Sequence, residues 1–246
     1  MQVAPGVERV NEFVINCYLV EEAGSLTLVD AGIGANWGLL LAGLANIGRT
    51  LADIDAVLLT HAHVDHIGMA DRIRAEAPAR VHIHEADRDP LLAGKRPPNA
   101  PDNTVGLWTA LRHGFAYRLL WYLARHGALS TPAVAEASAF ADGQVVDAPG
   151  HPRIVHAPGH TPGSAAILFE DRGVLCTGDA IVTLNAVNGS TGPRLAPAAF
   201  SSDPSGAFAS LARLEGLSAE LILPGHGEPF RGTPAAAVAL AREADH

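Results

Sequence analysis

The feature that most constrains the fold of this chain is an arrangement found four times, in which a short apolar run ends at a polar residue. His61 follows AVLLT, His160 follows RIVHAPG, Asp179 follows GVLCTG and His226 follows ELILPG. Short apolar runs of this kind are typical of buried strands. If they are strands of neighbouring layers, their carboxyl ends bring the four polar residues to one edge, where α/β proteins usually form ligand sites.

Strand-like and helix-like segments alternate along the rest of the chain, separated by turn residues. The strand-like segments are residues 16–20, 25–32, 54–60, 80–86, 152–159, 164–171, 173–179 and 220–225. The helix-like segments are residues 36–48, 69–77, 204–214 and 233–246. Alternation of strands and helices predicts a layered α/β protein.

The pattern changes between about residues 90 and 142. A turn-rich stretch, GKRPPNAPDN, precedes an apolar, helix-like window from Leu107 to Leu129. Arginines and histidines interrupt this window every few residues, which argues against a membrane span. We predict a helical lid inserted at about 90–142 into a single domain that covers residues 1–246. Its apolar face is interpreted as core or as a homodimer interface, with an acyl-chain pocket as the alternative.

Charge and cysteine content restrict the partners and the compartment. The chain has a formal net charge of -9 and only one lysine, so we expect a small-molecule substrate and no nucleic acid. Its two cysteines, Cys17 and Cys176, cannot make a disulfide framework, and the first residues lack the basic and apolar regions of a signal peptide. We therefore expect a cytoplasmic protein.

The polar clusters supply donor atoms for metal ions. The stretch THAHVDHIGMA contains His61, His63, Asp65 and His66, and the later clusters add His160, Asp179 and His226. Neutral imidazole and carboxylate groups bind Zn²⁺ at ~2.0–2.2 Å, and they also suit iron and manganese. Seven donors exceed one tetrahedral site, so we predict two divalent ions. Zinc is the first expectation, and a carboxylate such as Asp179 can bridge ions ~3.5–4 Å apart.

Taken together, HxHxDH, the histidine of PGHTPG, the aspartate of TGD and the histidine of PGHG resemble the motifs of the metallo-β-lactamase superfamily. The resemblance covers nearly the whole chain outside the lid. It implies an αββα sandwich of two mixed β-sheets with helices on the outer faces. It also implies that His61, His63 and His160 hold one ion, that Asp65, His66 and His226 hold the other, and that Asp179 bridges them.

The resemblance further implies that Asp30 of LVDAG lies behind the ligands and orients the histidine loop. From the residues alone, a turn-capping role for Asp30 is equally open. Lactamases with two zinc ions commonly have a cysteine where Asp179 stands, so the chain is more similar to the glyoxalase II and lactonase branches. Glyoxalase II has a helical C-terminal region that grips glutathione, but only twenty residues follow His226 here, so we do not expect specificity for glutathione thioesters.

The expected function is hydrolysis of an ester, thioester or lactone carbonyl by a hydroxide shared between the two ions, with Asp65 accepting the proton of the nucleophile. One alternative is an oxidoreductase similar to persulfide dioxygenases, in which His61, His160 and Asp179 hold a single iron. A less favoured alternative is a phosphodiesterase similar to ribonuclease Z, against which the negative net charge argues.

Overall fold

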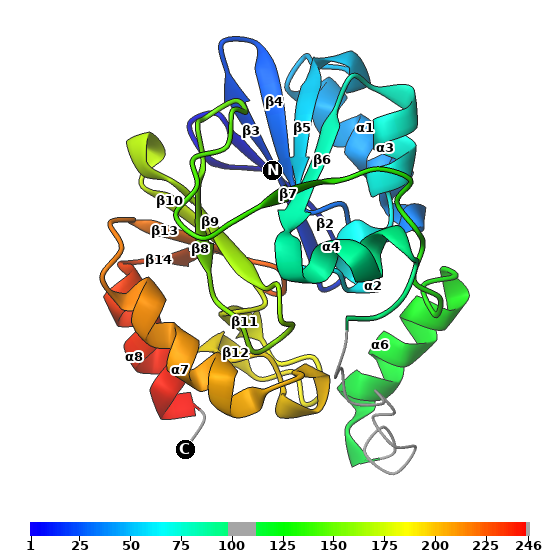
Figure 1. Cartoon of the computed structure of the whole chain (residues 1–246). Helices are drawn as coiled ribbons and strands as arrows, with labels where there is room; N and C mark the ends of the chain where they lie inside the picture. Colours follow the sequence, from blue (N-terminus) through cyan, green and yellow to red (C-terminus); the bar gives the residue numbers. More distant parts are fainter. Residues whose placement is uncertain (98–111, 245–246) are drawn as a thin grey trace.

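The computed structural model describes residues 1–97 and 112–244 of the chain. Two mixed β-sheets pack face to face, and helices cover their outer faces (Figure 1). This confirms the predicted αββα sandwich. Among the described residues, α-helices are found at α1 (Trp37–Asn46), α2 (Val64–Ile67), α3 (Ala70–Glu76), α4 (Glu85–Leu92), α6 (Gly114–Arg125), α7 (Pro204–Glu215) and α8 (Pro234–Ala244).

The amino-terminal sheet has seven strands in sequence order. They are β1 (Gln2–Ala4), β2 (Val7–Glu12), β3 (Ile15–Glu22), β4 (Ser25–Val29), β5 (Ile54–Leu58), β6 (Arg80–His84) and β7 (Ser138–Phe140). The first four strands pair antiparallel, and the pairs from β4 to β7 are parallel. The parallel half therefore places the end of β5 beside the end of β6, at the edge where the site lies.

The carboxyl-terminal sheet has five strands in the order β14-β13-β10-β9-β8. Its strands are β8 (Arg153–His156), β9 (Ala165–Phe169), β10 (Val174–Gly178), β13 (Leu221–Pro224) and β14 (Phe230–Arg231). Strands β10 and β13 are parallel neighbours with Gly178 opposite Pro224, so the residues that follow them emerge side by side. A separate ribbon of β11 (Val182–Leu184) and β12 (Thr191–Arg194) follows β10.

Alternation of side chains along the strands builds three apolar layers. Val29 and Leu58 point into the core between the sheets, where they join Phe169 and Leu223 of the other sheet. Their neighbours in sequence point outward, and Leu28 packs in the cluster that includes residues of α1 and α3. The outer face of the carboxyl-terminal sheet packs with residues of α7 and α8. Strand periodicity of two therefore makes every central strand apolar on both faces.

Most predicted segments appear as elements, and the lid region is the main exception. Helix α4 was not predicted: it begins within the predicted strand segment 80–86 and continues through Pro90 to Leu92. Helix α6 occupies Gly114–Arg125 within the predicted apolar window. The rest of that window up to residue 111 lies outside the described residues, and the inserted lid stays a prediction.

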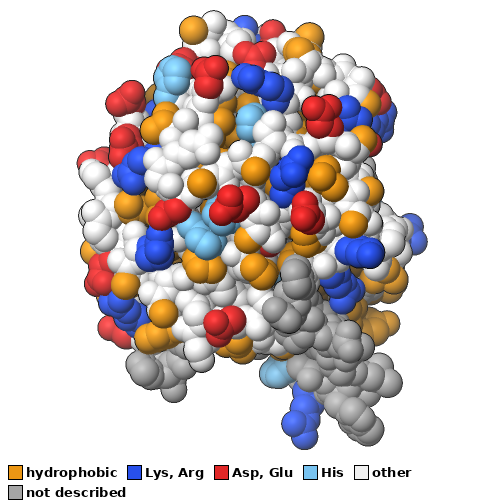
Figure 2. All heavy atoms as spheres, viewed as in Figure 1, with side chains coloured by type: hydrophobic (Ala, Val, Ile, Leu, Met, Phe, Trp, Pro, Cys, Tyr) orange, Lys and Arg blue, Asp and Glu red, His pale blue; other side chains and the backbone are white. Residues whose placement is uncertain are grey.

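The described helices are all too short or too polar to cross a membrane. Acidic and basic side chains are interspersed over the described part of the face seen in Figure 2.

Candidate metal centre

The seven predicted ligands and Asp30 come together at one edge of the two sheets. His61 follows β5, His160 follows β8, Asp179 follows β10 directly and His226 follows β13. Five of the seven ligand side chains are almost completely buried; His63 and Asp65 are partly exposed.

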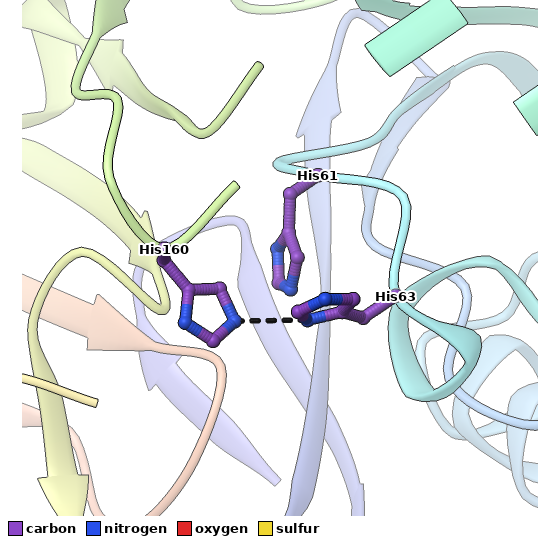
Figure 3. A group of neighbouring side chains, drawn as sticks. All are labelled: His61, His63 and His160. Atoms are coloured by element: carbon purple, nitrogen blue, oxygen red, sulfur yellow. Dashed lines mark hydrogen bonds between the residues drawn. The ribbon is translucent and has the colours of Figure 1, made fainter. Parts of the chain in front are cut away.

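Three histidine rings form a first group of donors. His61 and His63 project from the loop after β5, and His160 approaches them from the loop after β8, so that the three rings point toward one another (Figure 3). Nδ1 of His63 lies 2.9 Å from Nε2 of His160. One donor atom from each ring can be chosen so that all lie within 4.8 Å of one another.

A second group consists of Asp65, His66 and His226, again with donor atoms within 4.8 Å of one another. Nε2 of His226 lies 3.4 Å from Oδ2 of Asp65. Asp179 lies between the two groups: its Oδ2 is 3.3 Å from Nε2 of both His160 and His226, and its Oδ1 is 3.5 Å from Nε2 of His66. These two groups contain the same residues as the two ligand sets that the resemblance implies, and a third possible group, His61, His66 and Asp179, combines members of both.

Unpaired donor atoms indicate that the cluster fits a cation. Nε2 of His61, His63 and His66 and Oδ1 of Asp179 are buried and have no hydrogen-bond partner. A buried polar atom without a partner costs about 1–3 kcal/mol, and native proteins contain few of them. Four such atoms in one cluster are explained if metal coordination satisfies them.

The opposite nitrogen of several rings is fixed by the surrounding chain. Nδ1 of His226 lies 2.9 Å from the carbonyl oxygen of Val14 and donates to it, which leaves Nε2 as the free ligand atom. Nδ1 of His61 is 3.1 Å from the hydroxyl of Thr60. Contacts of this kind set the orientation and tautomer of a metal-binding imidazole.

Asp30 occupies the position behind the ligands that the resemblance implies. It is buried at a φ of 59°. Its Oδ1 accepts a hydrogen bond from the backbone N–H of Thr60, and its Oδ2 lies 2.8 Å from Nδ1 of His66. Asp30 therefore contacts both ends of the histidine loop, and its contacts go beyond capping its own turn.

Asp87 makes a comparable connection that the sequence analysis missed. It is fully buried near the start of α4. Its carboxylate accepts hydrogen bonds from the N–H of Ala62 (3.0 Å), the hydroxyl of Thr161 (2.7 Å) and the N–H of Gly163 (2.8 Å). Ala62 separates two predicted ligands, and Thr161 follows a third. Asp87 thus joins the ligand loops of the two sheets.

The histidines differ in their affinity for protons when no cation is bound. Burial lowers the pKa of His61, His63 and His160, to about 3 for His160, so these rings are neutral at pH 7. Burial also disfavours protonation of His66 and His226, but the neighbouring carboxylates outweigh it and raise the pKa to about 10 and about 9. A cation at the second group must therefore displace protons.

A chamber of about 170 Å³ adjoins the cluster. Predicted ligands form part of its lining, and apolar side chains of α6 and of the segment after Asp179 form most of the rest. A mostly apolar pocket with a few convergent polar groups is the usual form of a small-molecule site. The fold and this site together define the class of the protein as a candidate metalloenzyme of the αββα type.

Comparison with known proteins identifies the family. A family model described as the metallo-beta-lactamase superfamily matches residues 10–226. The probable metallo-hydrolase YflN of Bacillus subtilis (strain 168) is 29% identical over 245 residues, which cover 94% of this chain and 87% of that protein. Ribonuclease Z of Mycobacterium avium (strain 104) is 28% identical over 167 residues, or 66% of this chain and 55% of that protein.

Solved structures give the same result for the fold. A metallo-beta-lactamase family protein from Thermus thermophilus has a TM-score of 0.68 and 25% identity, covering 99% of this chain and 81% of that one. A metallo-beta-lactamase motif mutant from Cronobacter sakazakii has a TM-score of 0.71 and 21% identity, covering 100% and 94%. The chain belongs to the metallo-beta-lactamase superfamily. Membership and relatives together class it as a metallo-hydrolase.

Proposed function

We propose that the chain is a metal-dependent hydrolase that uses two divalent ions, zinc first among them, to cleave an ester, thioester or lactone carbonyl. The observation that carries this proposal is the pair of donor groups with Asp179 between them, within 3.5 Å of histidines from both. Such an arrangement suits two ions that share one carboxylate, as two-metal hydrolytic sites do.

In this proposal His61, His63 and His160 would hold one ion, Asp65, His66 and His226 would hold the other, and Asp179 would contribute its carboxylate to both. When bound, the two ions would supply hydroxide at neutral pH, because metal binding lowers the pKa of water to about 7, and would polarise the substrate carbonyl. Iron and manganese fit the same donors.

Asp65 is the side chain best placed to accept the proton of the attacking nucleophile. Burial alone would raise its pKa, but His66 and His226 outweigh burial and lower the pKa, so that the carboxylate is ionised at neutral pH. It lines the chamber and is partly exposed to it, so its oxygens are within reach of a substrate. Asp30 and Asp87 hold the ligand loops and act as positioning residues.

The chamber supports a carbonyl substrate over a nucleic acid. Arg96 is the one arginine or lysine among the described residues that line it. Proteins that grip a phosphate backbone use several basic side chains, because each neutralised phosphate adds to the affinity. The similarity to ribonuclease Z is nevertheless a reason to include phosphodiesters among the substrates tested.

The test is a substrate panel with metal analysis. Purified chain, loaded separately with zinc, manganese or iron, is assayed against esters, thioesters, lactones and phosphodiesters. The proposal predicts carbonyl hydrolysis with about two zinc ions per chain. Cleavage of phosphodiesters alone would overturn it in favour of a nuclease. Activity only with one iron per chain, accompanied by oxygen uptake, would overturn it in favour of the dioxygenase alternative.

A further inference from the structure

The chamber beside the metal ligands has two apolar walls. One wall is the face of α6 that carries Leu119, Leu120 and Leu123. The other comes from the chain after Asp179 and contains Leu184 of β11 and Phe200. The ligands His63, Asp65, His160, Asp179 and His226 also contribute to the lining, so one cavity joins the metal centre to the apolar walls.

Helix α6 is attached to the domain partly through contacts outside the chamber. Phe13 stacks on Phe115 with ring centroids 5.7 Å apart and contacts Tyr122 at 5.2 Å. Neither aromatic residue of α6 lines the chamber. Leu120 and Leu123 do line it and remain partly exposed. Binding of an apolar ligand over these side chains is favourable, because it removes their apolar surface from water.

The lining also determines what chemistry fits. Apart from the predicted ligands, the described lining residues are apolar except for Arg96 and Thr131. A polar portion of the substrate would lose its hydrogen bonds to water there without gaining new ones. An apolar portion has no such hydrogen bonds to lose. The volume of about 170 Å³ is more than ten times the roughly 10–15 Å³ that a cavity needs to hold one water molecule, so several carbon atoms of a substrate fit.

We propose that the chamber binds the apolar acyl portion of the substrate, and that the enzyme prefers longer acyl groups such as hexanoyl over acetyl. This inference rests on the proposed carbonyl hydrolysis. The occupant of the chamber is a substrate group because the cavity is continuous with the predicted metal ligands. An acyl chain between the α6 wall and the Phe200 wall would extend from a carbonyl that faces Asp65 and Asp179.

A chain-length series tests the proposal directly. The substrates are thioesters that share the same leaving group and differ only in the acyl group: acetyl, butanoyl, hexanoyl, octanoyl or decanoyl. Their kcat/KM values are compared on the zinc-loaded protein. Each buried methylene is expected to raise kcat/KM about fourfold until the chamber is full. Hexanoyl has four more methylenes than acetyl and should therefore exceed it by roughly 250-fold. Equal kcat/KM along the series would overturn the proposal.

Variants on opposite faces of α6 provide a matched comparison. Leu123→Trp fills part of the chamber and should move the optimum to a shorter acyl group. Leu120→Lys places a charge in the apolar wall and should weaken the hexanoyl preference about tenfold or more. Trp121→Leu alters the exposed face of the same helix, where Trp121 is 56% exposed, and should leave the series unchanged. Identical profiles for all three variants would contradict the proposal.

A binding measurement separates failure of this inference from failure of the proposed function. Calorimetry compares hexanoate with acetate on the zinc-loaded protein, and hexanoate should bind about 250-fold more tightly. A hexanoate preference without turnover of any carbonyl substrate supports the chamber and overturns the hydrolase. Turnover without a preference overturns the chamber alone. If Leu120→Lys converts a dimer to a monomer and the series is unchanged, a second copy occupies the chamber and the proposal is wrong.

Discussion

Asp87 offers the sharpest test of how the metal centre is held together. Its buried carboxylate accepts hydrogen bonds from Ala62, Thr161 and Gly163, on the two loops that carry His61, His63 and His160. Asp87→Ala leaves two backbone N–H groups and one hydroxyl without this partner. Asp87→Asn keeps the shape of the side chain but replaces one acceptor oxygen with an NH₂ group that cannot accept from an N–H.

The expected magnitudes follow from these contacts. A hydrogen bond to a charged group contributes about 1.5–3 kcal/mol, so Asp87→Asn should lower the free energy of unfolding by about 2 kcal/mol. Asp87→Ala should lower it by about 3–5 kcal/mol, since the desolvation that the carboxylate no longer suffers offsets part of the loss. If Asp87 positions the ligand loops, zinc affinity should fall about 10–100-fold in Asp87→Asn, as when other residues that support metal ligands are altered.

Two measurements and one control distinguish positioning from general stability. Urea unfolding of the metal-free protein gives the free energy of unfolding, and competition with a chelator gives the zinc affinity. Thr27→Val is the control, because it removes a partly buried hydrogen bond from Thr27 to the carbonyl of Pro149 in which no predicted ligand takes part. It should cost about 1 kcal/mol and leave the zinc affinity unchanged. An unchanged zinc affinity in Asp87→Asn would refute the positioning role.

Three further predictions concern the same site. Asp179→Ala should abolish turnover together with binding of the second metal ion, and full activity would exclude a bridging role. Gly178→Ala should lower the free energy of unfolding, measured by urea denaturation, by about 2–4 kcal/mol. The reason is that Gly178 has φ +50° and an added Cβ would lie 2.5 Å from Oγ1 of Thr60. A loss below about 1 kcal/mol would show that the loop adapts. Zinc affinity should rise with pH up to about 9–10, because His66 and His226 carry protons that the ion must displace; a flat profile from about pH 6 to 9 would count against these ligands. In the metal-free chain the same raised pKa values contribute stability that is complete below pH 6.5 and is lost as the pH rises through about 9 to 10, so urea unfolding should show the opposite trend.

The sequence predicted a layered α/β protein and the convergence of the ligands because both depend on local patterns, whereas the αββα sandwich was implied by the resemblance to a known superfamily. Short apolar runs marked β5, β10 and β13, and the donors stand just after them. Parallel pairing of β10 with β13 then brings Asp179 and His226 together without any information beyond strand direction.

Features that depend on distant partners were not predicted. Strand β2 has the sequence VERVNE, and its Arg9 is only 4% exposed because the side chain bonds to Asn16 and Glu228. Glu228 is 219 residues away, so the local pattern held no indication of a buried arginine. Asp87 was missed for the same reason, since its partners lie on loops of both sheets. One feature of the sequence could have indicated it, however: Asp87 is an acidic residue that follows β6, a strand whose carboxyl end lies at the edge that carries the site.

Helix α4 shows a different limit. Pro90 lies within the helix, and proline normally indicates a turn or a helix end because it lacks a backbone N–H. The helix continues only as far as Leu92, and Leu91 is fully buried in the core outside the amino-terminal sheet. Packing of this kind outweighs local propensity and is not visible in the sequence.

The measurement that tests the central claim most directly is the metal content of the chain before and after Asp179→Ala, determined on the same samples as thioester hydrolysis. If two ions share the carboxylate of Asp179, the wild-type chain should contain about two zinc ions and the variant one or none. Hydrolysis should be lost in parallel with the zinc. Two zinc ions and full hydrolysis in Asp179→Ala, or a single iron with oxygen uptake in the wild type, would contradict the two-ion hydrolase.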